Sequence, residues 1–144
     1  MIEIAGMQME DLAEVAAIEK SIFSQPWSEN GFAASLQSKD TLYLTARLDG
    51  KIAGYCGFLQ SFDEADITNV AVKESCRRRG VAETMLAELI KRGAARGVTA
   101  FTLEVRRSNA GAITLYEKLG FVNCGIRRNF YEKPAEDAVI MWKR

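Results

Sequence analysis

Histidine is absent from all 144 residues of this sequence. The Ser-His-Asp and Cys-His forms of nucleophilic catalysis are therefore excluded. Zinc sites built on a helical His-Glu-x-x-His motif and iron sites with two histidine ligands are excluded for the same reason. Any acid–base chemistry must then use carboxylates, tyrosine, lysine, cysteine or bound water.

Cysteine is scarce, and its positions do not suggest pairing. Cys56, Cys76 and Cys124 are odd in number and far apart in the sequence. This pattern is typical of reduced thiols in the cytoplasm rather than of a disulfide framework or a zinc site. We therefore expect no metal, and we interpret the thiol of Cys76 as a spectator rather than a nucleophile.

The chain also lacks net charge, long apolar runs and linker-like segments. Its 19 basic and 19 acidic residues balance, which disfavours a nonspecific nucleic-acid binder, because such proteins depend on excess positive charge. No apolar run is long enough to cross a membrane, and the alternating, acidic N-terminus is unlike a signal peptide. Without repeats or a linker, the sequence predicts one domain, residues 1–144, in the cytoplasm.

Hydrophobic periodicity predicts strands and helices along the whole chain. The expected strands are residues 2–5, 41–48, 51–60, 65–72, 99–105, 121–128 and 138–143. The expected helices are residues 9–23, 28–36, 82–96 and 109–119. Asp49-Gly50 predicts a hairpin turn, and Glu19 is a charged intrusion in the apolar face of the first helix. Because a helix joins 65–72 to 99–105, these two strands should be parallel within a mixed sheet that has helices on both faces.

The most informative segment joins the strand at 65–72 to the next helix. Arg77-Arg78-Arg79-Gly80 opens that helix. The first backbone N–H groups of a helix have no intrahelical partner and lie at the positive end of the helix dipole, so this turn predicts an anion site. Gly80 would let a ligand approach the backbone closely. The spacing matches neither a P-loop nor G-x-G-x-x-G; a solvated basic turn is the simpler alternative.

The motif Arg-x-x-Gly-x-Ala, from Arg77 to Ala82, resembles the pyrophosphate-binding motif of the GNAT superfamily of acyl-CoA N-acetyltransferases. Residues 103–121 (LEVRRSNAGAITLYEKLGF) and 126–131 (IRRNFY) look like the RimI branch of that superfamily, which acetylates the N-terminal amine of a ribosomal protein. The resemblance covers almost the whole chain. It implies an α+β fold of three αβα layers, with a mixed sheet of about seven strands and four helices, and acetyl-CoA as the acetyl donor.

The resemblance also implies which residues hold acetyl-CoA. In GNAT enzymes two parallel strands splay apart, and the pantetheine arm pairs with backbone in the gap. Here that backbone would belong to Val70, Ala71 and Val72, although the valines equally fit a plain core strand. The pyrophosphate would meet six residues of the basic turn and helix start: Arg78, Arg79, Gly80, Val81, Ala82 and Glu83. Asn109 would contact pantetheine, cap the last helix, or do both; Ser108 is the other candidate cap.

Two residues are candidates for proton transfer. Glu104 lies in a strand that we expect to be central and covered on both faces, where a carboxylate is costly unless it is paired or functional. An ion pair with Arg106 or another cation is the structural alternative. In the RimI branch the matching glutamate takes a proton from the incoming amine, through water. The matching tyrosine, Tyr116 here, protonates the departing CoA thiolate; its position on an apolar helix face would otherwise indicate a core tyrosine.

The acceptor side is less constrained by the sequence. Trp27, Phe130 and Tyr131 resemble residues that line the acceptor groove of the family, but such aromatic residues also pack into cores. Six acidic residues either face a basic peptide or form a solvated rim: Asp63, Glu64, Asp66, Glu132, Glu136 and Asp137.

The resemblance implies that the acceptor is a protein N-terminus, on a basic ribosomal protein that begins with alanine. We expect neither a nucleic acid nor a membrane as a direct partner. Two alternatives remain at this point: a GNAT enzyme that acetylates lysine or a small amine, and a non-catalytic acyl-CoA sensor. The presence of both Glu104 and Tyr116 favours an enzyme over the sensor.

Overall fold

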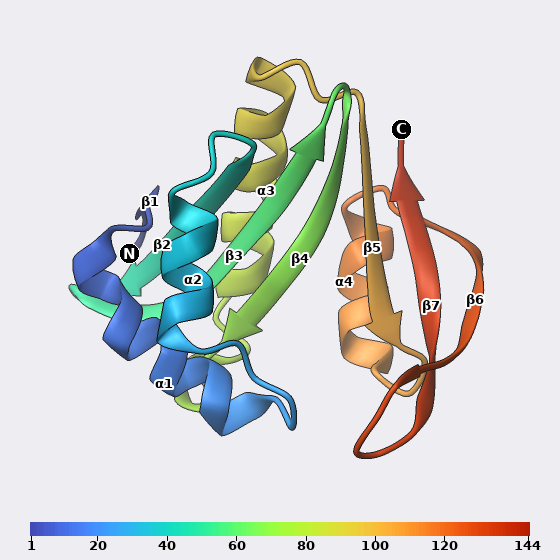
Figure 1. The fold of residues 1–144 in the computed structure, drawn as a ribbon, viewed down its shortest axis with the longest axis horizontal. Helices are drawn as coiled ribbons and strands as arrows, with labels where there is room; N and C mark the ends of the chain where they lie inside the picture. The colour runs from blue at the N-terminus through green and yellow to red at the C-terminus, as the bar shows by residue number, and fades with distance from the viewer.

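The computed structural model describes residues 1–144 and contains one seven-stranded mixed sheet with helices on both sides (Figure 1). The strands are β1 (Ile2–Gly6), β2 (Thr41–Leu48), β3 (Lys51–Ser61), β4 (Glu64–Val72), β5 (Ala100–Arg106), β6 (Val122–Tyr131) and β7 (Glu136–Lys143). The helices are α1 (Leu12–Ile22), α2 (Glu29–Leu36), α3 (Val81–Ala95) and α4 (Ala110–Lys118). The expected numbers of strands and helices are confirmed.

Local sequence signals account for most element boundaries. The Ser28 hydroxyl accepts a hydrogen bond from the Gly31 N–H at 3.0 Å and caps α2, and Asn109, rather than Ser108, caps α4. Asp49 and Gly50 both adopt positive φ angles, of 52° and 81°. This is the conformation that a tight hairpin between β2 and β3 requires.

Two expected boundaries were wrong. The first turn of the expected helix 9–23 is a separate 3₁₀ turn, Met9–Asp11, in which the Asp11 carboxylate accepts a hydrogen bond from the Gln8 N–H at 2.8 Å. The expected loop 129–137 is shorter, because β6 extends to Tyr131 and β7 begins at Glu136. A register shift between Arg127 and Tyr131 lets the strand continue through residues that read as a loop.

The strand order is β1-β2-β3-β4-β5-β7-β6, and β4–β5 is the parallel pair. Pairing between these two strands is short. It begins at Glu64 with Ala100 and ends at Asp66 with Thr102, whereas β4 continues to Val72 and β5 to Arg106. Beyond that point the strands diverge, as Figure 1 shows.

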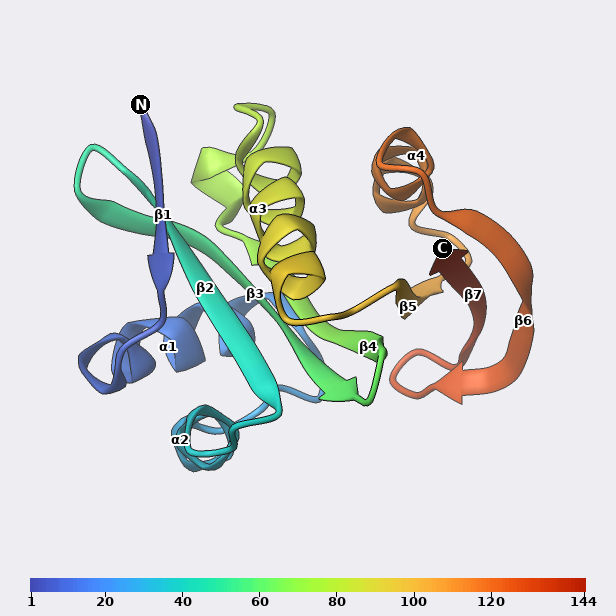
Figure 2. The same ribbon diagram turned by 90° about the horizontal axis from the view of Figure 1, so that it is seen from above.

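Helices cover the two faces of the sheet in pairs: α1 and α2 lie on one face, and α3 and α4 on the other (Figure 2). The larger apolar cluster includes Met85, Leu86 and Leu89 of α3, and the smaller one includes Val15 of α1 and Phe32 of α2. Full burial of one such side chain contributes about 2 kcal/mol to stability. None of the helices combines the length and apolar character needed to cross a lipid bilayer.

Candidate active site

A cavity of about 560 Å³ lies where β4 and β5 diverge. Its walls come from β4, β5, the hairpin of β6 and β7, the end of α1 with its connection to α2, and α4 with the residues that precede it. Glu104, Tyr116 and Asn109 all line it. The tertiary structure therefore brings together the three residues that the sequence picked from β5, α4 and the start of α4.

The backbone of β4 has a free edge along this divergence. The Lys73 N–H bonds the Ala53 carbonyl of β3 at 2.7 Å. Because the bonding direction alternates along a strand, Ala71 also bonds towards β3, and the polar groups of Val70 and Val72 face the gap. The Val72 carbonyl accepts a hydrogen bond from Arg77 Nε at 3.3 Å, which agrees with that direction. Of the three residues expected to hold pantetheine, two therefore face the divergence, and the Ala71 side chain packs in the smaller apolar cluster.

A second cavity, of about 240 Å³, adjoins the start of α3. Its lining includes Val72 and five of the six residues expected to meet the pyrophosphate, Arg79 being the exception. The first intrahelical bond runs from the Thr84 N–H to the Gly80 carbonyl at 3.0 Å. The backbone donors from Gly80 to Glu83 consequently have no intrahelical partner.

Gly80 shapes the space in front of these donors. Its φ is 77°, and a Cβ atom built on it would meet no heavy atom within 4 Å. The Glu83 side chain points to α4, where it pairs with Lys118 Nζ at 2.7 Å, so only its backbone is directed at the turn. Open space, free donors and a basic neighbour, Arg78, fit a bound pyrophosphate.

Glu104 is half-buried and paired. Arg127 Nη1 donates to its Oε2 at 3.1 Å, and 21% of the Glu104 side chain remains exposed. The expectation that both faces of β5 are covered was wrong, because Glu104 and Arg106 face the cavity. The charge of Glu104 matters to Asp66 across the strands. Burial of the Asp66 carboxyl is the main cause that raises its pKa, and the negative charge of Glu104 adds to this effect. The positive charge of Arg127 opposes the shift.

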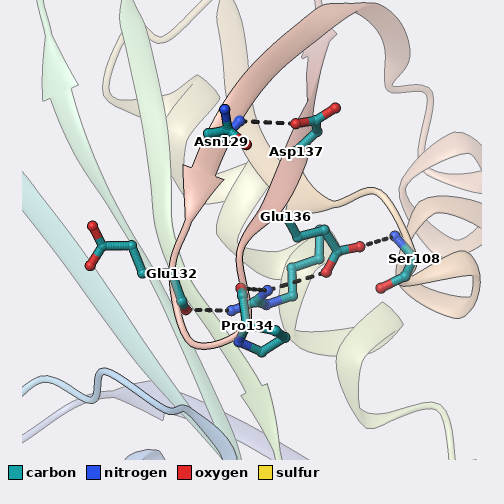
Figure 3. A network of polar contacts seen from close by, with 7 residues as sticks. Ser108, Asn129, Glu132, Pro134, Glu136 and Asp137 are labelled. Carbon is teal, nitrogen blue, oxygen red and sulfur yellow. Dashed lines mark hydrogen bonds and ion pairs between the residues drawn. The ribbon is translucent and has the colours of Figure 1, made fainter.

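Arg106, the other cation considered for Glu104, has a different role. It donates to Glu136 Oε1 at 3.2 Å and to the Pro134 carbonyl at 3.0 Å. Glu136 Oε2 accepts from the Ser108 N–H at 2.6 Å (Figure 3). These contacts fasten the β6–β7 loop to the start of α4. The hydrogen bonds from Ser108, with Arg106, hold the pKa of Glu136 below its ordinary value.

The acidic residues considered for a basic acceptor are largely engaged within the protein. Asp137 accepts from the Asn129 N–H at 2.9 Å (Figure 3), and Glu132 accepts from Gln25 at 3.4 Å. Asp63 and Glu64 lie at the start of β4, the end away from the divergence. Among the six, only Glu136 lines the larger cavity.

Tyr116 is held by its neighbour Phe121. The Phe121 N–H donates to the Tyr116 carbonyl at 2.9 Å, and the Gly120 N–H donates to the Glu117 carbonyl at 3.0 Å. This is the Schellman ending that Gly120 and Phe121 predict. The Tyr116 hydroxyl makes no hydrogen bond within the protein although the residue is only 7% exposed. Burial raises the pKa of this hydroxyl, so it carries its proton at neutral pH.

Two of the three aromatic candidates line the larger cavity: Trp27 and Tyr131 do, and Phe130 does not. The Arg106 guanidinium lies 4.4 Å from the Tyr131 ring centroid. Burial, reinforced by the charge of Glu104, raises the pKa of Tyr131 to about 12. Trp27 packs on Phe32 with ring centroids 5.3 Å apart.

Two cavity residues were missed as site candidates. Glu19 is buried; it accepts from the Tyr55 hydroxyl at 2.6 Å and from the Trp27 N–H at 3.0 Å. Its position within an apolar helix face was the signal that could have found it. Asn69 is a buried polar residue in β4, and its place directly before Val70, in the strand expected to hold pantetheine, was a similar signal.

The chain matches the Acetyltransferase (GNAT) family over residues 12–121. It belongs to the GNAT acetyltransferase family. Members of this family use acetyl-CoA as the acetyl donor. The expected fold, a mixed seven-stranded sheet with four helices, is the one that its GNAT structural neighbours share.

Individual relatives are similar over nearly the full length. The ribosomal protein bS18-alanine N-acetyltransferase of Escherichia coli (strain K12) is 39% identical over 143 residues, which cover 98% of this chain and 96% of the relative. The crystal structure of the ribosomal-protein-S18-alanine N-acetyltransferase from Escherichia coli matches with a TM-score of 0.91 and 39% identity, over 99% of this chain and 93% of that one.

A more distant GNAT structure shares the fold. Arabidopsis thaliana NAA60 in complex with a bisubstrate analogue matches with a TM-score of 0.86 over 99% of this chain and 97% of that one. Sequence identity is 20%, so this likeness bears on the fold alone.

Proposed function

We propose that this chain transfers the acetyl group of acetyl-CoA to the N-terminal amine of a protein, and that the acceptor is a ribosomal protein that begins with alanine. The supporting observation is that a carboxylate, Glu104, and a protonated hydroxyl, Tyr116, line one cavity in a chain 39% identical to a ribosomal protein bS18-alanine N-acetyltransferase. We also propose that residues 1–144 act as one domain.

The residues around the two cavities divide the work of holding acetyl-CoA. The N–H groups from Gly80 to Glu83 and the side chains of Arg78 and Arg79 would bind the pyrophosphate. The backbone of Val70 and Val72 would pair with the pantetheine arm, and Asn109 would contact it from the start of α4. When bound, acetyl-CoA supplies the activated acetyl group as a thioester. Its carbonyl would be polarised by the N–H groups on the free edge of β4.

Proton transfer would use the two candidate residues in turn. The incoming amine must lose a proton to attack, and Glu104 would accept it through a water molecule. Tyr116 would donate its hydroxyl proton to the sulfur that leaves. Burial raises the pKa of this hydroxyl, which keeps its proton available at neutral pH but makes it a weaker acid, so transfer would occur only as negative charge develops on the sulfur. Because the chain has no histidine, this acid–base chemistry would use a carboxylate and a tyrosine in its place.

The ionisation of amines favours an α-amine as acceptor. An α-amine has a pKa near 8 and a lysine side chain one near 10.4, a difference that corresponds to about 3 kcal/mol of deprotonation cost. At pH 7 roughly a tenth of an α-amine is neutral, against well under a thousandth of a lysine. A site in which Glu104 is the one candidate base is better matched to the α-amine, because that amine loses its proton more readily.

The test is acetyl transfer to a basic peptide that begins with alanine and contains one internal lysine. Mass spectrometry locates the acetyl group, and a peptide with a blocked N-terminus is the control. We expect acetylation of the N-terminus and little transfer to the blocked peptide. Preferential transfer to the lysine would leave an acetyltransferase with a different acceptor class, and transfer to no amine would favour the sensor.

A further inference from the structure

We propose that Asn69 recognises the acceptor: its side-chain amide donates a hydrogen bond to the carbonyl oxygen of the acceptor's first peptide bond. This contact would select protein N-termini over lysine side chains. The inference rests on the proposed function, because it concerns the acceptor of that same reaction.

Asn69 lies at an irregularity of β4. Gly57 of β3 pairs with Asn69, whereas the next residue, Phe58, pairs with Ile67, so Thr68 has no partner of its own. An extra residue of this kind re-aims the side chains beside it. The bulge lies where β4 has already separated from β5, since their pairing ends at Asp66.

A row across three strands orients the Asn69 amide. Tyr43 of β2 pairs with Gly57 of β3, which pairs in turn with Asn69. A Cβ atom on Gly57 would lie 2.3 Å from the Tyr43 ring, so only glycine lets the ring cross β3. The Tyr43 hydroxyl then donates to Asn69 Oδ1 at 2.9 Å.

The proton count defines which end of the amide is free. The Tyr43 hydroxyl has one proton, which it gives to Asn69; it must therefore accept the proton of the Thr68 hydroxyl, 2.8 Å away. Burial raises the pKa of Tyr43, so this donor persists at neutral pH. With Oδ1 bonded to Tyr43, the Nδ2 group is the opposite end of the amide.

No protein group accepts a hydrogen bond from that end. Asn69 is 7% exposed, and the protein contains no fully buried side-chain nitrogen or oxygen that lacks a partner. The Nδ2 group consequently keeps its exposure through the larger cavity, which Asn69 lines. Its two N–H donors match an oxygen acceptor on a ligand.

The face of the sheet indicates which ligand supplies that oxygen. Asn69 bonds Tyr43, a member of the apolar cluster under α1 and α2, and the Tyr43 ring lies 6.3 Å from that of Trp27. Tyr116 belongs to the cluster on the α3 and α4 face. Asn69 is thus on the same face of the sheet as Trp27, and Tyr116 and the start of α3 lie on the opposite face.

The first carbonyl is the chemical feature that separates the two amine classes. In a protein N-terminus the carbonyl carbon is attached to the same Cα atom as the amine, whereas a lysine amine is separated from the backbone by four methylene groups. A donor built to bond an oxygen discriminates strongly against a substrate that lacks it, because the buried donor is left unpaired.

The test combines enzyme variants with two acceptors. One acceptor is the alanine-starting peptide, and the other replaces its first peptide bond by an (E)-alkene, which keeps the shape and removes the oxygen. For the unmodified protein we expect kcat/KM to be roughly 10- to 100-fold lower with the alkene peptide. Asn69→Ala should lower kcat/KM for the normal peptide by a similar factor, mainly through KM, and should have little effect with the alkene peptide.

Further measurements separate this role from a structural one. The KM for acetyl-CoA should change little in Asn69→Ala, whereas the thermal unfolding midpoint should fall, because the buried Tyr43 hydroxyl loses its acceptor. Tyr43→Phe retains the amide but removes the bond that orients it, so it should give a smaller loss, again specific to the normal peptide.

Equal loss for both peptides in Asn69→Ala would overturn the proposal. If that variant does not fold, the unmodified protein still decides the question: equal kcat/KM for the two peptides would refute the contact. N-terminal transfer that is indifferent to the carbonyl leaves the proposed function standing without this inference. Absence of N-terminal transfer removes both.

Discussion

Arg127 on β6 donates to Oε2 of Glu104 on β5 at 3.1 Å, across the intervening strand β7. The guanidinium is the more exposed partner, with 58% of its side chain accessible against 21% for Glu104. The arginine therefore holds one carboxylate oxygen from the solvent side, while Oε1 makes no hydrogen bond within the protein. A purely structural ion pair and a positioned base share this geometry, and substitutions distinguish them.

Glu104→Gln tests the base. The change keeps the size of the side chain and removes its ability to accept a proton, so kcat should fall by about 10²-fold. Acetyl-CoA affinity, measured by calorimetry, should be unchanged because the anion turn is intact. Arg127→Ala is the matched control, since it removes the cation and leaves the carboxylate. We expect that variant to retain most of its turnover; equal losses in the two variants would mean that the ion pair itself is what matters.

Gly80→Asp tests the anion turn. A side chain and a negative charge would enter the open space in front of the free N–H groups and oppose the helix dipole. We expect a large loss of acetyl-CoA affinity. Gly50→Asp is the control, because Gly50 also has a positive φ, of 81°, with no heavy atom within 4 Å of a built Cβ. Both changes put a side chain at a left-handed backbone position, at a cost of about 1–2 kcal/mol each, so weaker binding in both variants would contradict the assignment.

Tyr116→Phe tests the acid. The ring contact with Phe121 is retained and the lost hydroxyl has no hydrogen bond within the protein, so the free energy of unfolding should not decrease, because burying an unpaired hydroxyl is unfavourable. Turnover should fall by roughly 10- to 100-fold, with the KM for acetyl-CoA little changed. Steady-state kinetics and thermal unfolding measure the two effects. Turnover equal to that of the unmodified protein would transfer the acid role to another group.

Glu136→Gln tests the loop contacts through pH. The pKa of Glu136 is lowered in the folded protein by Ser108 and Arg106. A carboxylate with a lowered pKa stabilises the fold above its ordinary pKa, and that contribution is lost as pH falls through the lowered value.

The variant should therefore unfold at a lower temperature than the parent protein at pH 7, and the difference should shrink below about pH 4. Glu117→Gln, at an exposed residue of α4, controls for the loss of one negative charge. A constant difference between Glu136→Gln and the parent protein across this pH range would rule out the ionic contribution.

Elements with local signals were well predicted from the sequence. Ser28, Asn109 and Gly120 act within a few residues of their own position, so helix ends could be placed without knowledge of the rest of the chain. The β6–β7 hairpin was harder. Its strands run further than expected because pairing with β7, and a shift in register after Arg127, keep residues extended that look like a loop in isolation.

The ion-pair partner of Glu104 could not be predicted from the sequence either. Arg106 is two residues from Glu104 and was the natural candidate, but it bonds Glu136 and Pro134 instead. Arg127 is 23 residues from Glu104 in the sequence. It is the partner because the strand order β5-β7-β6 places β6 next to β7, so that the Arg127 side chain reaches Glu104 across β7.

The sequence by itself determined the repertoire of this protein: no histidine, a carboxylate in a strand, a tyrosine on a helix face, and a glycine at the start of a helix with free N–H groups. Those properties depend on residue type and on contacts within a few residues. Only the tertiary structure decided that β4 and β5 part after Asp66, so that Glu104 and Tyr116 share one cavity, and that Gly57 lets Tyr43 orient Asn69. Such arrangements depend on strand order and register, which are set by packing between segments that lie far apart in the chain.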